Sequence, residues 1–136
     1  ASEHDLLVQF LSAKASVAAA QPNTMQFALT IKEVERISEQ LKQPLYKASL
    51  QLLLSEALFE TEPYRAQHIH STIDIAQIES VESATANRLV ARWWALRSVL
   101  EPQQKIPSIR EAILRFRLSG CPNRARALSK QLHQSM

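Results

Sequence analysis

The chain has 136 residues, 46% of them hydrophobic, and a formal net charge of +3. A chain of this length usually folds as one domain, and a single helical-repeat domain over residues 1–136 is the expectation here. The one cysteine, Cys121, excludes an internal disulfide, and the one glycine, Gly120, argues against sheet-rich folds and glycine-rich phosphate loops. No apolar run reaches the ~18 residues that cross a bilayer, so a soluble, cytoplasmic protein without a membrane partner is expected. Because the chain begins at Ala1, a fragment of a larger protein, a processed chain and an exported product all fit it.

Apolar residues recur at helical spacing along nearly the whole chain, and no segment alternates with a period of two. The pattern is interrupted by proline, glycine and helix-capping residues. It therefore predicts an all-α fold of about seven helices joined by short connections, which makes neighbouring helices antiparallel. The predicted helices cover residues 2–20, 24–42, 45–60, 63–79, 84–101, 107–119 and 122–134.

Two arrangements fit these helices, a compact helical bundle and a stack of helical hairpins. Hairpins that begin near residues 4, 45 and 86 are 41 residues apart, and a period of this size is typical of α-solenoids. The residues 45–58 are apolar around most of the helix, as expected where two neighbours cover it. The spacing therefore favours the stack.

Part of the chain resembles the tetratricopeptide-repeat (TPR) superfamily. The first matching stretch is Ala112, Ile113, Leu114, Leu118 and Gly120, followed after a turn by Arg124, Ala125, Ala127, Leu128 and Leu132. Residues 50–58 and 64–76 form a weaker copy of the same helix, turn and helix. The resemblance covers about residues 45–134. It implies a short TPR-like α-solenoid that binds a peptide or protein in a groove, as in bacterial transcription regulators and signalling proteins.

The motifs of catalysis and metal binding are missing from the sequence. One glycine cannot build a P-loop, a dinucleotide fingerprint or a nucleophile elbow. His68 and His70 are two residues apart, so on a helix they point to nearly opposite sides and cannot share one ion. Cys121 has no histidine beside it in sequence to activate its thiol. We therefore expect no enzyme activity, no metal and no cofactor.

Charge is distributed unevenly along the chain. Residues 1–87 carry six basic and eleven acidic side chains, a net charge of −5, whereas residues 88–136 carry ten basic and two acidic ones, a net charge of +8. Such a chain attracts an acidic protein or peptide, or another copy head to tail, to its C-terminal half. Arginine binds carboxylates and phosphates equally well, so a nucleic-acid partner is the alternative. Pairing of these arginines with acidic residues of the N-terminal half is a further alternative.

The two tryptophans are adjacent on one predicted helix. Trp93 shares the apolar stripe of Leu89 and Leu96, which predicts a core position, whereas Trp94 is offset by ~100° and is either core or an exposed anchor. Tryptophan and arginine are enriched at binding hot spots. The candidate partner-binding residues are Arg88, Arg92, Trp94, Arg97, Arg117 and Arg124.

Overall fold

The computed structural model describes residues 3–135, and these residues form helices and connecting turns without any strand. The predicted all-α fold is confirmed. The chain divides into two compact units, which we call unit 1 (Ala1–Ile73) and unit 2 (Asp74–Met136). In chain order the helices are α1 (Glu3–Ala19), α2 (Met25–Gln40), α3 (Pro44–Leu58), α4 (Pro63–Thr72), α5 (Ile75–Glu79), α6 (Ala84–Leu100), the 3-10 helix η1 (Pro102–Gln104), α7 (Lys105–Leu118) and α8 (Pro122–Ser135).

The fourth predicted helix, residues 63–79, is wrong as one element because the structure divides it into α4 and α5. Ile73 has the extended conformation φ −75°, ψ 122°, which ends α4. The side chain of Asp74 then accepts a hydrogen bond from the backbone N–H of Gln77 and caps α5. The other predicted helices agree with the structure within two residues, and residue 2, included in the first of them, lies outside the described residues.

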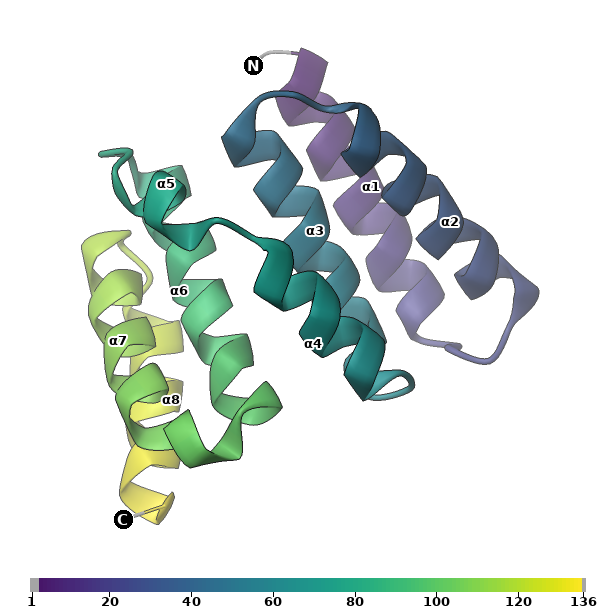
Figure 1. The fold of residues 1–136 in the computed structure, drawn as a ribbon. Helices are drawn as coiled ribbons and strands as arrows, with labels where there is room; N and C mark the ends of the chain where they lie inside the picture. The colour runs from purple at the N-terminus through teal and green to yellow at the C-terminus, as the bar shows by residue number, and fades with distance from the viewer. Residues whose placement is uncertain (1–2, 136) are drawn as a thin grey trace. The chain divides into compact units, whose positions relative to one another are not determined.

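Unit 1 is built around α3. This helix packs against α1, α2 and α4, and α1 also packs against α2 (Figure 1). Its leucines Leu50, Leu52 and Leu54 are each at most 3% exposed although they point in different directions, because three helices surround them. The buried hydroxyl of Ser55 donates a 2.6 Å hydrogen bond to the carbonyl of Ala66 and joins α3 to α4.

Helix starts in unit 1 are specified by local chemistry. Thr24 caps α2 through its side-chain oxygen, which accepts a hydrogen bond from the backbone N–H of Phe27. Pro44 and Pro63 occupy the first turns of α3 and α4, where a missing N–H leaves no helical hydrogen bond unmade. The short connections between these helices therefore have defined ends.

In unit 2, α7 packs against both α6 and α8, and α5 packs against α6 (Figure 1). One cluster joins the three longer helices, with α7 in the middle. Its buried members are Ala91, Ile109, Ala112, Ile113, Phe116 and Ala125, and Trp94, Ala95, Cys121, Leu128 and Leu132 pack against them. Ser83 caps α6, since its hydroxyl accepts a hydrogen bond from the N–H of Ala86.

The turn between α7 and α8 depends on the glycine. Gly120 has φ 76°, the left-handed conformation that other residues adopt only with strain. The N–H of Cys121 donates to the carbonyl of Phe116 at 2.8 Å, and that of Gly120 to Arg117 at 3.2 Å. These bonds satisfy the last carbonyls of α7 in the manner of a Schellman turn, and Pro122 starts α8 directly afterwards.

Candidate binding surfaces

Unit 1 contains a pocket of ≈ 450 Å³, which we call the unit 1 groove. It forms because α2 and α4 both pack on α3 while their own backbones stay apart in the described part of the chain. The residues that line it are Pro22, Asn23, Thr24, Phe27, Ala28, Ile31, Lys32, Leu58, Thr61, Glu62 and Arg65.

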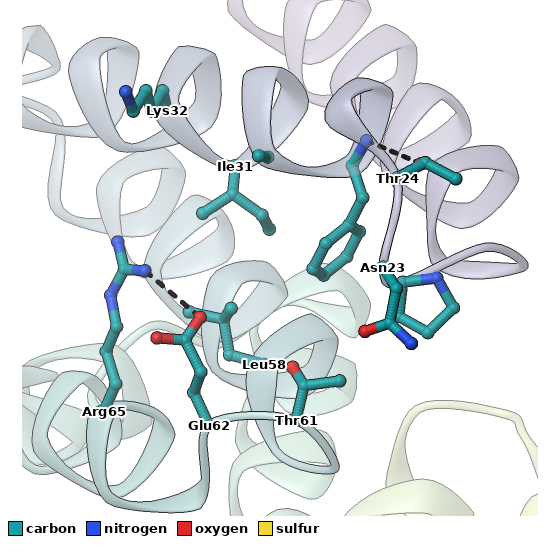
Figure 2. Close-up of a pocket in the computed structure, with 11 residues that line it drawn as sticks. Asn23, Thr24, Ile31, Lys32, Leu58, Thr61, Glu62 and Arg65 are labelled. Carbon is teal, nitrogen blue, oxygen red and sulfur yellow. Dashed lines mark hydrogen bonds and ion pairs between the residues drawn. The ribbon is translucent and has the colours of Figure 1, made fainter.

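The floor of the groove is apolar. Phe27, Ile31 and Leu58 form it, and their side chains are almost fully buried. Figure 2 shows Ile31 reaching from α2 toward Leu58 at the end of α3. A ligand placed here would meet a hydrocarbon surface already fixed by the core of unit 1.

One side of the groove is held by ion pairs. Arg65 on α4 pairs with Glu35 on α2 and, at 3.4 Å, with Glu62 before α4. Figure 2 shows Glu62 and Arg65 together on this side. Because the guanidinium joins the two helices that form the walls, its charge is largely compensated and its role is to hold α4 beside α2.

Other rim groups are free. Lys32 is exposed, and it has no ion-pair partner among the residues that the structure describes. The side chains of Asn23 and Thr61, which come from two different loops, are likewise without hydrogen-bond partners within residues 3–135 (Figure 2). The groove thus offers one uncompensated cation and two hydrogen-bonding groups around an apolar floor.

A smaller hollow of ≈ 210 Å³ lies beside the groove. The two share Pro22 and Thr61, and the smaller one is lined also by Glu56 and Glu60.

All six predicted partner-binding residues lie in unit 2, but on three different helices. Arg88, Arg92, Trp94 and Arg97 are on α6, Arg117 is on α7 and Arg124 is on α8. Arg88, Arg117 and Arg124 are exposed, whereas Arg92, Trp94 and Arg97 are half-buried.

Trp94 and Arg97 contact the core of unit 2 and each other, and neither is a free surface side chain. Trp94 packs against the cluster between α6, α7 and α8, and its ring lies edge-on to that of Trp93, with 4.9 Å between centroids. The Arg97 guanidinium lies 5.2 Å from the Trp94 centroid and 5.6 Å from that of Trp93, and it donates a 2.6 Å hydrogen bond to Glu101. Trp93, expected in the core, is only half-buried.

Arg115, which was not among the candidate residues, makes three hydrogen bonds within unit 2. It donates hydrogen bonds to Glu79 at the end of α5, to Asn87 on α6 and to Glu111 on α7, at 3.3 Å, 3.3 Å and 3.4 Å. Arg115 thus pairs with Glu79, one of the acidic residues of residues 1–87, as one of the alternatives from the sequence expected. Arg124 instead lies 4.4 Å from the centroid of the Phe116 ring.

A different surface emerges on α7, which we call the α7 outer face, made of Arg110, Leu114, Arg117 and Leu118. These residues are three or four positions apart, so they lie on one side of the helix. Leu114 is 50% and Leu118 60% exposed. Sequence reasoning missed the two leucines because leucine at helical spacing normally indicates core, and the only available signal was their offset from the stripe of Ile109, Ile113 and Phe116.

His68 and His70 lie in different environments, as their spacing of two residues on one helix predicts. His68 is exposed and His70 is 5% exposed. Among the described residues no cluster of three or more His, Cys, Asp or Glu side chains is arranged to hold a metal ion. Within the same residues, every helix is too short or too polar to cross a membrane.

Comparison of the chain with protein-family models, with curated proteins and with solved structures found no match.

Proposed function

We propose that this chain is a helical protein-interaction domain that binds an extended segment of a partner protein in the unit 1 groove. The observation that carries the proposal is the combination of an apolar floor, a free lysine and two unpaired polar side chains in one depression. Binding sites of this size typically combine an apolar lining with a few polar groups that orient the ligand.

The lining defines the chemistry of the segment. An apolar side chain would lie over the floor at Phe27 and Ile31, and a carboxylate beside it would pair with Lys32. The free main-chain N–H and C=O groups of an extended peptide would hydrogen-bond to Asn23 and Thr61. A helical peptide could not make these bonds, because its main-chain groups are already paired within the helix. The preferred partner segment is therefore extended, with leucine or phenylalanine next to aspartate or glutamate.

A role in regulation is part of the same proposal. It rests on the resemblance of residues 45–134 to tetratricopeptide repeats, whose hairpins present grooves to peptides in bacterial transcription regulators and signalling proteins. The packing of α3 against both preceding helices suits a stack of hairpins. Fold resemblance supports the class of function, and the groove supplies the site.

The test uses short fluorescent peptides that carry one leucine or phenylalanine beside aspartate or glutamate, with binding measured by anisotropy. Lys32→Glu should weaken binding by about tenfold or more, since one carboxylate contact is replaced by repulsion. Ala28→Trp, which fills the groove without removing a charge, should weaken it as well.

Lys42→Glu is the matched control, because Lys42 is an exposed lysine of unit 1 outside the groove. Equal losses in Lys32→Glu and Lys42→Glu would show that general charge, and not the groove, attracts the peptide. Unchanged binding in Ala28→Trp would place the peptide elsewhere.

A nucleic-acid-binding function is the second candidate, and the charge of unit 2 favours it. Residues 74–136 carry ten basic and five acidic side chains, a net charge of +5. Phosphate neutralisation would make the affinity for random duplex and single strands fall steeply with salt. Tight binding of either with such a salt slope would replace the peptide-binding proposal as the principal function.

A further inference from the structure

We propose that the α7 outer face is a second docking surface, which takes an acidic amphipathic helix of a partner protein. The proposal is independent of the unit 1 groove, since it rests on unit 2 alone. It requires apolar contact, uncompensated positive charge and a suitable spacing to occur together on one exposed helix face.

The apolar contact comes from Leu114 and Leu118. They are one turn apart and are 50% and 60% exposed, so about half of each side chain is available to a partner. On the opposite side of the same helix, Ile109, Ala112 and Phe116 are fully buried in the cluster of unit 2. The leucines are therefore not needed to hold α7 in place.

The positive charge is uncompensated. Arg110 and Arg117 are exposed, and neither has an ion-pair partner within residues 3–135. Three of the five acidic residues of unit 2 are already paired, Glu79 and Glu111 with Arg115 and Glu101 with Arg97, and Glu82 pairs with neither arginine of the α7 outer face. Asp74 caps α5. Within the described residues these two arginines are therefore without an ion pair, and a partner can supply the carboxylates.

The spacing selects a helix as the occupant. Two leucines separated by one turn form the apolar stripe that packs into the matching stripe of a second helix. Arg110 and Arg117 lie two turns apart on the same side of the leucines, where they can reach glutamates along one edge of that stripe. A nucleic acid would use the arginines and leave the leucines exposed, and a second copy of this face would place arginines against arginines.

The probe is a synthetic amphipathic helix of about three heptads, with leucine at the core positions and glutamate at the flanking ones. Binding to the full chain is measured by anisotropy at physiological ionic strength. The double variants Leu114→Ala/Leu118→Ala and Arg110→Gln/Arg117→Gln should each weaken binding by about tenfold or more, and the second should also reduce the salt dependence.

Matched controls come from exposed residues of the same types. Leu29→Ala changes a leucine on α2 that is 55% exposed, and Arg126→Gln changes an exposed arginine on α8. Both should bind the probe as the unchanged chain does. Circular dichroism should show the same helix content in all variants, because every substituted side chain is exposed.

Three results would overturn the proposal. The first is a loss in the arginine variant with no loss in the leucine variant, which is the behaviour of a phosphate-binding or purely electrostatic surface. The second is an equal loss in the controls. The third is self-association of the chain that disappears in the leucine variant, which would make a second copy the occupant. Loss of peptide binding on Lys32→Glu, with probe binding kept, would leave this proposal standing and test the groove separately.

Discussion

Units 1 and 2 are both helical and of similar length, but they differ in net charge. Unit 1 has six basic and eight acidic residues, a net charge of −2, whereas unit 2 has ten and five, a net charge of +5. Arg65 and Lys14 of unit 1 find carboxylates on neighbouring helices. Unit 2 has half as many acidic as basic residues, and its Arg110 and Arg117 are exposed and without an ion-pair partner within residues 3–135. Charge of one sign that exceeds internal pairing is what makes a surface available to a partner.

The two units also differ in the role of the arginine that contacts two carboxylates in each. Arg115 and Arg65 each contact two carboxylates, but the Arg115 side chain is 19% exposed and that of Arg65 is 39% exposed. Arg115 therefore belongs to the framework of unit 2, while Arg65 lies at the edge of a groove. Burial, more than the number of contacts, distinguishes the two roles.

The largest expected effect is that of Phe116→Ala in unit 2. Phe116 is 1% exposed and joins the cluster of three helices, so its truncation should lower the free energy of unfolding by ~3–5 kcal/mol. Both tryptophans of the chain lie in α6, so urea unfolding followed by tryptophan fluorescence reports on this unit. A loss below about 1 kcal/mol would mean that the cluster does not hold unit 2 together.

A second prediction compares the two anchoring arginines. Arg115→Met should lower the free energy of unfolding by about 1.5–3 kcal/mol, because hydrogen bonds to charged groups are lost in a partly buried place. Arg65→Met should cost less than about 1 kcal/mol, as is usual for exposed ion pairs. Urea unfolding followed by circular dichroism measures both. Arg117→Met serves as the control and should change little, and equal effects of all three would contradict the distinction between framework and surface.

A third prediction, with a smaller effect than that of Arg115→Met, concerns the turn between α7 and α8, which has no counterpart in unit 1 because Gly120 is the only glycine. Gly120→Ala should lower the free energy of unfolding by about 1–2 kcal/mol, the cost of a left-handed conformation in a residue with a Cβ. No atom lies within 4 Å of the place where that Cβ would be, so the cost is conformational alone. A stabilised variant in thermal unfolding would show that the turn does not require positive φ.

The helical periodicity of apolar residues, together with the proline, glycine and capping residues between helices, was sufficient to predict the secondary structure of most of the chain. Helix ends are set by local residues such as the caps Thr24 and Ser83 and the turn at Gly120. These signals can be recognised in the sequence without knowing which helices pack together. The break between α4 and α5 was missed because Ile69, Ile73 and Ala76 continue an apolar stripe across it. Only the extended backbone of Ile73 and the cap at Asp74 reveal the break.

The sequence by itself determined that this protein is helical, that its C-terminal half is basic and that glycine-dependent nucleotide motifs are absent, because these depend on composition and local spacing. Tertiary structure decided which side chains face outward. Trp94, a candidate anchor, packs on the cluster of unit 2, whereas Leu114, in a segment that reads as core, stands half exposed. Exposure depends on which helix covers which face, and that is set by packing between segments far apart in the chain.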